Sequence, residues 1–240
     1  MTWKTTNTAK GDNKLYSDAK GVVPSLDLRF AEGKTLNDYM TGQNLITFSR
    51  SSIGTYVDEN GIIQTAIADQ PRFDHDPTTG ESLGLLIEES RTNEVSYSTI
   101  TTANWGVVDG ATITDNQAIA PDGTNTAALI NFPASGGPRI SITTSNASGV
   151  RTVSCWVRAV SGTVTIRIGN GSDFGLNQTI GTEWTRIYEE VPSSSNSAGI
   201  YCSNPVSVAQ FYTWGFQQEA GSFPTSYIPT TGTALTRSAD

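Results

Sequence analysis

Short runs in which apolar and polar residues alternate recur along the chain. Leu26–Phe30, Arg139–Thr143 and Val153–Arg158 all follow this period of two. Because side chains alternate across a β-strand, the pattern is typical of strands with one buried face. Further strands are expected from the apolar rows at 44–50, 164–168, 184–191 and 211–218. No segment keeps a helical period over three turns, so the pattern predicts an all-β protein.

One hairpin is predicted together with its turn. Thr55–Val57 and Ile62–Gln64 flank the residues Asp-Glu-Asn-Gly at 58–61. Asn-Gly readily supplies the positive φ angles of a tight turn between antiparallel strands. Residues 33–44 are predicted as a loop or short helix. From residue 95 onward, short strands separated by turn signals predict a β-sandwich or jelly roll.

The composition narrows the classes of partner. Charged residues make up 16% of the 240 residues, below the roughly 25% typical of soluble domains. The net charge of −8 disfavours nucleic acid, whose phosphates need a basic patch, and the fifteen Lys and Arg are scattered singly. We therefore expect no nucleic-acid partner.

The N-terminal residues and the two cysteines indicate the cellular compartment in which the protein is made. Residues 1–30 contain no apolar core of a signal peptide, and no apolar run approaches the roughly 18 residues of a membrane span. Cys155 and Cys202 lie in apolar stretches and are expected as buried free thiols. These features predict synthesis and assembly in a cytosol, without membrane insertion.

The acidic pairs do not have the spacing of a catalytic site. Glu88-Glu89 and Glu189-Glu190 are adjacent in sequence, and neighbours on a strand point to opposite faces, so neither pair flanks one glycosidic bond. His75 is the single histidine, and no Gly-x-Ser-x-Gly elbow accompanies it. We expect His75 in a polar turn and no enzymatic activity.

Metal chemistry is limited to calcium. One histidine and two separated cysteines form no zinc site. Asp122 could contribute to the about six to eight oxygen ligands that calcium needs, as could Asp74 and Asp76. Asp122-Gly123 is equally typical of a plain turn. We expect no cofactor other than this candidate structural calcium near Asp122.

Several motifs occur in an order that resembles the carbohydrate-binding-module-like jelly rolls attached to glycan hydrolases and phage fibres. They are Asn104-Trp105, Ala120–Thr124, Val153–Ala159, Glu183–Arg186 and Tyr212–Glu219. Pro71–Pro77, Gly84–Asn93 and Gly221–Thr230 resemble the lead-in and closing segments of tailed-bacteriophage virion proteins. The resemblance covers most of the chain and implies a jelly-roll β-sandwich. Within it, Glu88, Arg91 and Asn93 are expected to hold the junction between the lead-in and the sandwich.

Three parts are predicted from this resemblance and the polar N-terminus. Residues 1–24 form an extended attachment arm with Trp3 and Tyr16 as anchors, residues 25–94 a β-rich lead-in, and residues 95–240 the jelly roll. The alternative for the first part is a flexible tail.

The resemblance also implies a role and partners. It implies a virion protein of the capsid or tail, either a fibre or spike tip or a decoration protein. The implied partners are other phage virion proteins and two further copies in a homotrimer. The implied location is the phage particle, after synthesis in the bacterial host cytoplasm.

Binding to host surface polysaccharide is the positive hypothesis, because sugar rings stack on aromatic side chains. If alternate residues of Val153–Val157 face the core, Trp156 and Arg158 share the opposite face and form a stacking platform. Further candidates expected near it are Arg139, Tyr201 and Trp105. The alternative is that residues 25–93 or a subunit contact cover Trp156.

The other aromatic residues are expected to be structural. The row Tyr212, Trp214 and Phe216 would expose a large apolar surface unless it builds the core. Trp184 is expected to cap an edge of the sandwich.

Two functions from other classes stay open, a glycan-active enzyme and a free-standing carbohydrate-binding module.

Overall fold

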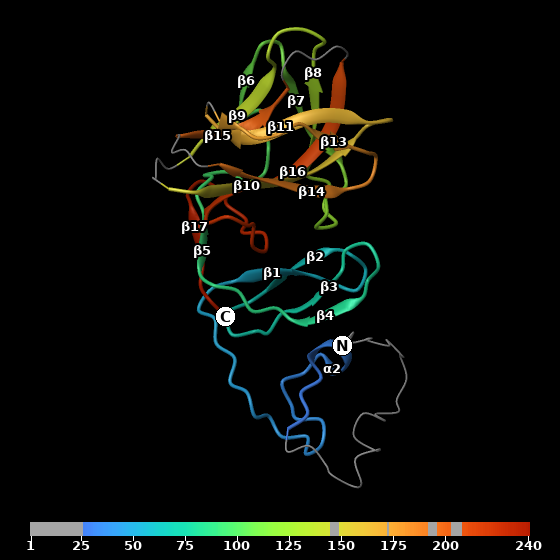
Figure 1. Cartoon of the computed structure of the whole chain (residues 1–240), viewed down its shortest axis with the longest axis vertical. Coiled ribbons are helices and arrows are strands. Elements are labelled where there is room, and N and C mark those ends of the chain that lie inside the picture. Colours follow the sequence, from blue (N-terminus) through green and yellow to red (C-terminus); the bar gives the residue numbers. More distant parts are fainter. Residues whose placement is uncertain (1–25, 145–148, 172, 192–195, 203–207) are drawn as a thin grey trace, which may run out of the picture. The chain divides into compact units, whose positions relative to one another are not determined.

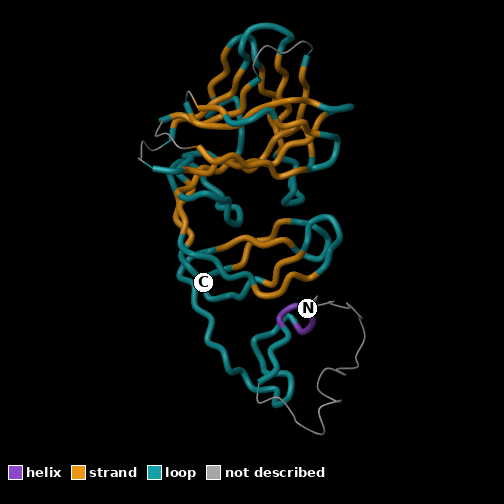
Figure 2. The backbone as a smooth tube through the Cα atoms, viewed as in Figure 1, coloured by secondary structure: helices purple, strands orange, loops and turns teal. Residues whose placement is uncertain are grey.

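The structure, a computed structural model, describes residues 26–144, 149–171, 173–191, 196–202 and 208–240. The predicted attachment arm, with Trp3 and Tyr16, lies outside the described residues. The chain divides into two compact units, residues 1–47 and 48–240. The described part of the larger unit consists almost entirely of strands and loops (Figure 2).

The described part of the first unit contains one short helix, α2 (Phe30–Gly33), and no strand. The predictions of strands at 26–30 and 44–50 are wrong. In place of a strand partner, the Asp27 amide donates to Asp38 Oδ1 at 2.7 Å, and the Arg29 guanidinium binds the Asp27 carboxylate. An alternating pattern cannot form a strand without a neighbour for its backbone groups.

Two small hairpins open the second unit. They are β1 (Gly54–Val57) with β2 (Ile63–Ala66), and β3 (Phe73–His75) with β4 (Ser82–Leu85). We call residues 48–90 the hairpin layer. The first hairpin confirms the prediction, but its turn differs because only Gly61, and not Asn60, has a positive φ. The Asp58 carboxylate instead accepts hydrogen bonds from the amides of Asn60 and Ile62 and closes the wider loop.

Two antiparallel sheets form the sandwich (Figure 1). The five-stranded sheet has the order β14 (Thr185–Val191), β10 (Arg151–Ala159), β16 (Ala209–Ala220), β8 (Ala127–Phe132), β7 (Thr112–Ala118). The six-stranded sheet has the order β12 (Asp173–Phe174), β11 (Val164–Asn170), β15 (Ser197–Tyr201), β9 (Arg139–Thr143), β6 (Gly106–Val108), with β13 (Gln178–Ile180) beside β11. From β8 to β11 successive strands alternate between the sheets, as in a jelly roll, and the predicted fold class is confirmed.

The main core lies between the two sheets. Val153, Cys155 and Val157 of β10 point into it, as their alternation predicted, and each is fully buried. Burial of one such side chain stabilises the fold by about 1.5–3 kcal/mol. Cys155 and Cys202 are both free and buried, which confirms the prediction for the thiols. Burial raises the pKa of the Cys155 thiol to about 12.

A second cluster attaches the hairpin layer to the outer face of the five-stranded sheet. Its members come from both parts: Ile63, Ala118, Ala120, Ala127, Trp214 and Tyr227, with Val57, Trp156, Trp184 and Tyr212 packed against them. The predicted single aromatic row on β16 is therefore wrong. Gly215, with a φ of 66°, forms a bulge, so Trp214 joins this second cluster while Phe216 enters the main core.

Charged residues fasten the hairpin layer to the end of the chain. A short sheet of β5 (Arg91–Asn93) and β17 (Leu235–Arg237) brings Asp240 beside the buried guanidinium groups of Arg50 and Arg72. Glu88 binds Arg72 at 2.8 Å. The predicted junction is confirmed at Glu88, which accepts hydrogen bonds from Ser226, and at Asn93, which donates to the Ile228 carbonyl oxygen. Arg91 forms its ion pair with Glu89 and lies over the Phe223 ring.

Candidate functional site

The outward face of the six-stranded sheet carries the candidate site. On β9, Ile140 and Ile142 are buried in the main core, so Arg139 and Ser141 point away from it. The neighbouring strand β15 places Tyr201 opposite Arg139 and Gly199 opposite Ser141. Two residues that the sequence proposed, Arg139 and Tyr201, therefore lie side by side.

A groove of about 250 Å³ runs over this face. It is lined by Arg139, Ser141, Gly171, Phe174, Asn196, Ser197, Ala198 and Gly199. We call it the outer-sheet groove. Gly199 forms part of the floor of the groove, and no side chain fits there, because a Cβ would lie 2.1 Å from the backbone oxygen of Ile140. The close approach of β9 and β15 therefore excludes any side chain at this position.

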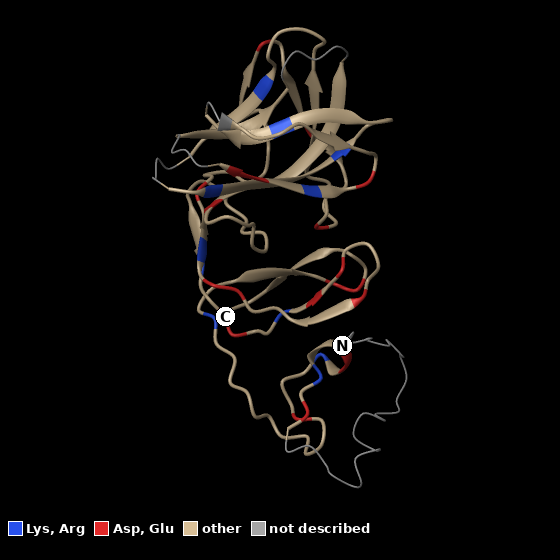
Figure 3. Cartoon of the chain, in the orientation of Figure 1, with Lys and Arg blue, Asp and Glu red and all other residues tan. Residues whose placement is uncertain are grey.

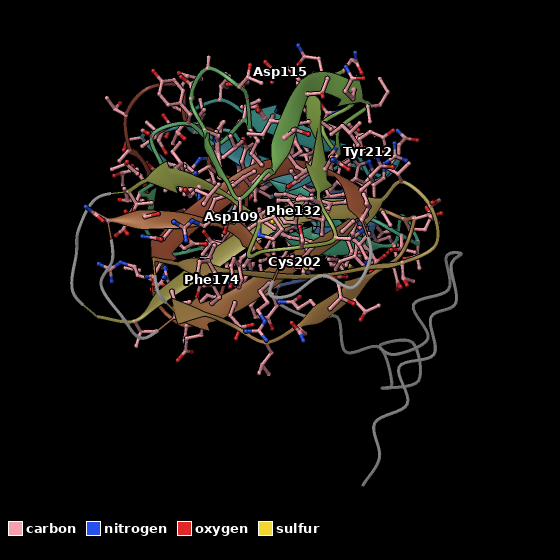
Figure 4. All side chains as sticks on the ribbon, turned by 90° about the horizontal axis from the view of Figure 1, so that it is seen from above. Asp109, Asp115, Phe132, Phe174, Cys202 and Tyr212 are labelled. Carbon is pink, nitrogen blue, oxygen red and sulfur yellow. The ribbon has the colours of Figure 1, made fainter. Side chains whose placement is uncertain are left out.

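A stacked aromatic pair stands beside the groove. The rings of Phe174 and Tyr201 have centroids 4.4 Å apart and planes inclined by 18°. Phe174 comes from β12, the edge strand of the sheet, and Figure 4 labels it together with Asp109. Asp109 Oδ2 accepts a hydrogen bond from the Gly137 amide at 3.3 Å. Phe174 was not predicted from the sequence, because a strand of two residues is too short to show alternation.

Two arginines stand on the same face. Arg139 is exposed, whereas Arg167 on β11 is half-buried and donates from Nε to Asn177 Oδ1 at 2.7 Å. Elsewhere on the described sandwich, positive and negative residues are scattered and form no basic patch (Figure 3). The groove thus combines a cation, small polar residues and an aromatic pair.

The remaining platform residues lie on the other sheet. Trp156 and Arg158 belong to β10, so the core separates them from Arg139 and Tyr201, and the expectation that all four lie together is wrong. The Arg186 guanidinium lies over the Trp156 ring at 4.5 Å.

Trp156 is covered on several sides. Its ring also packs edge-on against Trp214 and Tyr227, at centroid distances of 5.4 and 5.8 Å. The second cluster also contains Ile63 and Val57 of the hairpin layer, so this layer packs over Trp156, as the alternative in the sequence analysis expected of the lead-in.

Two other residues proposed for glycan binding, Arg158 and Trp105, have structural contacts instead. Arg158 lies over the rings of both Trp184 and Tyr212, at 5.1 and 4.9 Å. Trp105 is only 4% exposed and packs edge-on against Phe216 at 4.9 Å. Trp105 therefore belongs to the main core and offers no surface for stacking a ligand.

A second hollow, of about 180 Å³, lies between the hairpin layer and the five-stranded sheet. Its walls include Asp74, Glu88, Trp156 and Arg186. Burial raises the pKa of Asp74, although the hydrogen bond from the Val57 amide opposes this. Burial also acts to raise the pKa of Glu88, but hydrogen bonds from Ser226 and the nearby arginines together lower it. Glu88 is thus held as a structural anion.

The remaining sequence candidates have local structural roles. Asp122 Oδ1 accepts hydrogen bonds from the amide and hydroxyl of Thr124, which closes a turn. Within the described ranges, no three His, Cys, Asp or Glu residues gather as metal ligands, so calcium near Asp122 stays a prediction. His75 is not in a turn; it is buried on β3, with Nδ1 2.9 Å from the Val57 carbonyl oxygen. No helix among the described residues is long and apolar enough to cross a membrane.

No family model and no curated protein matches the chain. Among solved structures, a xylan-binding domain from Paenibacillus barcinonensis aligns at 14% identity and a TM-score of 0.38, covering 55% of this chain and 94% of the domain. A family 11 carbohydrate-binding module from Clostridium thermocellum aligns at 12% identity and a TM-score of 0.40, covering 57% of this chain and 99% of the module.

A phage protein is also similar. The enzymatically active domain of tailspike protein 4 from bacteriophage CBA120 aligns at 16% identity and a TM-score of 0.37, covering 52% of this chain and 21% of that chain.

Proposed function

We propose that the chain is a non-catalytic glycan-binding protein of a tailed-bacteriophage particle, and that the outer-sheet groove binds polysaccharide of the host surface. The observation that carries the proposal is the groove itself. Its glycine floor leaves room for a ligand, its rim places Arg139 beside the ligand, and Phe174 lines it with an aromatic ring.

The groove matches the chemistry of a sugar chain. A pyranose ring has an apolar face, which packs on aromatic carbon, and a rim of hydroxyl groups, which need hydrogen-bonding partners. Phe174 supplies the aromatic carbon, and Ser141, Asn196 and Ser197 bring polar side chains to the lining. Binding sites usually combine such apolar contacts with a few polar groups that fix orientation.

The location on a phage particle rests on the sequence resemblance. In this proposal residues 1–24 attach the protein to other virion proteins of the capsid or tail, and three copies assemble. Deletion of residues 1–24 should abolish incorporation into particles, measured by blotting purified phage for the protein. Unchanged incorporation would contradict the attachment role, while sedimentation of the purified protein tests the trimer.

The binding role is tested by the substitution Phe174→Ala. Loss of one stacked ring should weaken binding to host polysaccharide about tenfold or more, measured by affinity electrophoresis. The matched control is Tyr188→Ala, which removes an aromatic that is 53% exposed on β14 of the other sheet. Equal binding by the two variants would contradict the assignment of the groove.

The same samples test the absence of catalysis. Incubation of the protein with each polysaccharide that it binds should release no reducing ends. Release that disappears in Asp74→Asn would instead identify an enzyme with its site in the hollow beside the hairpin layer. A free-standing module would show the same binding but would be absent from purified particles.

A further inference from the structure

We propose that the ligand of the outer-sheet groove is an acidic polysaccharide, whose carboxylate or similar oxyanion binds Arg139. This inference rests on the proposed function, because it names the class of glycan that the same groove takes. It is carried by the state of Arg139 and by the charges around it.

Arg139 differs from the other described arginines in having no partner. Six others form ion pairs with carboxylates: Arg29, Arg50, Arg72, Arg91, Arg151 and Arg237. Arg158 and Arg186 lie over aromatic rings, and Arg167 binds Asn177. Among the described residues nothing pairs with the exposed Arg139 guanidinium, so its donors are available to a ligand.

Among the described residues, the lining of the groove contains this one cation and no carboxylate. That is unusual for a chain with a net charge of −8. Asp109 lies at the end of the neighbouring strand β6, but its carboxylate accepts from the Gly137 amide and forms no ion pair with Arg139. The described residues that form the groove therefore do not neutralise the charge of Arg139.

An oxyanion is the group that fits this position best. A guanidinium donates two parallel hydrogen bonds to a carboxylate, and such charge-assisted bonds are roughly twice as strong as those to a neutral hydroxyl. The walls of the groove reduce the screening by water that an isolated surface pair would experience. Sugars that carry carboxylates, such as uronic acids, would thus be preferred over neutral sugars with the same linkage.

The experiment compares acidic polymers with their own neutral forms. Polygalacturonate, alginate and hyaluronate are each tested beside the carboxyl-reduced derivative, in which the carboxylate has become a hydroxymethyl group. Binding to the wild-type protein is measured by calorimetry at low and at high salt. We expect at least one acidic polymer to bind about tenfold or more tightly than its reduced form, with a preference that shrinks as salt rises.

Substitutions assign the preference to one residue. Arg139→Gln should remove the preference without changing the thermal midpoint, because the side chain is exposed. Arg139→Lys should keep part of it, because an ammonium retains the charge but not the paired donors. Lys34→Gln removes an exposed cation from the first unit and serves as the control.

The outcomes separate this inference from the proposed function. Equal binding to both members of each pair would overturn the acidic ligand and leave glycan binding in place. A preference that survives in Arg139→Gln would overturn the role of Arg139. Failure of the wild-type protein to bind any member of any pair would count against glycan binding by the groove itself.

Discussion

At the scale of single residues, Gly199 shows how a missing side chain shapes a binding surface. The residue lies in the middle strand of three, and its neighbours approach so closely that a Cβ would meet the Ile140 carbonyl oxygen. Glycine usually weakens a strand, since it loses more conformational entropy on folding than other residues. At this position that loss is offset by close backbone packing, which also forms the floor of the groove.

Gly199→Ala should therefore damage both stability and binding. Overpacking of this kind lowers the free energy of unfolding by about 1–3 kcal/mol, which urea denaturation would measure. Gly181→Ala is the control, because an added Cβ there meets nothing within 4 Å. Equal unfolding free energies for the two variants would show that β9 and β15 separate readily, contrary to the observed contact.

At the scale of elements, β10 has two faces with different tasks. One face supplies Val153, Cys155 and Val157 to the main core, and the other presents Trp156 to the hairpin layer. The hairpin layer thus lies over this face, and Trp156, the tryptophan proposed as a sugar platform, helps to attach that layer to the sandwich.

Trp156→Ala tests this division of tasks. Removal of the half-buried ring should lower the free energy of unfolding by about 2–4 kcal/mol, since it leaves a cavity beside Trp214 and Tyr227. Polysaccharide affinity, measured well below the midpoint of unfolding, should stay unchanged because the outer-sheet groove lies on the opposite sheet. Loss of affinity by a fully folded variant would place the ligand on β10 instead.

At the scale of the second unit, buried charges join residues that are far apart in sequence. Arg50, Arg72 and Arg237 are each at most 1% exposed and share the carboxylates of Glu88 and Asp240. Burial acts to raise the pKa of Asp240, but the hydrogen bonds from Arg50 and Arg72 together lower it. The cluster thus holds the C-terminal strand against the hairpin layer only while these carboxylates are ionised.

Asp240→Asn should be costly at neutral pH and less so in acid. Loss of the charge leaves the buried Arg50 without a carboxylate and Arg72 with Glu88 alone, and breaking a buried ion pair typically costs about 3–5 kcal/mol. Because the pKa of Asp240 in the folded protein lies below its ordinary 3.8, its stabilisation is present above that value and is lost as the pH falls through the folded pKa. Unfolding free energies of wild type and variant should converge below pH 3.8, and a constant difference would contradict the linkage.

The sequence by itself determined the features that depend on neighbours along the chain. Alternation predicted β9 and β10, a turn motif predicted the first hairpin, and apolar surroundings predicted buried thiols at Cys155 and Cys202. Two of the proposed glycan contacts, Arg139 and Tyr201, lie at the candidate groove, and Phe174 was not predicted.

Only the tertiary structure decided which sheet each strand joins and what covers each face. Alternation shows which side chains share a face, but it does not reveal the partner of that face, because pairing depends on contacts between distant segments. Three segments with the same alternation therefore have different outcomes. In β10 the outward Trp156 is covered, in β9 the outward Arg139 lines an open groove, and residues 26–30 form no strand. The bulge at Gly215 changes which residues of β16 face the main core. It could not be predicted from alternation, because it depends on the packing of Trp156, a residue far away in sequence, against Gly215.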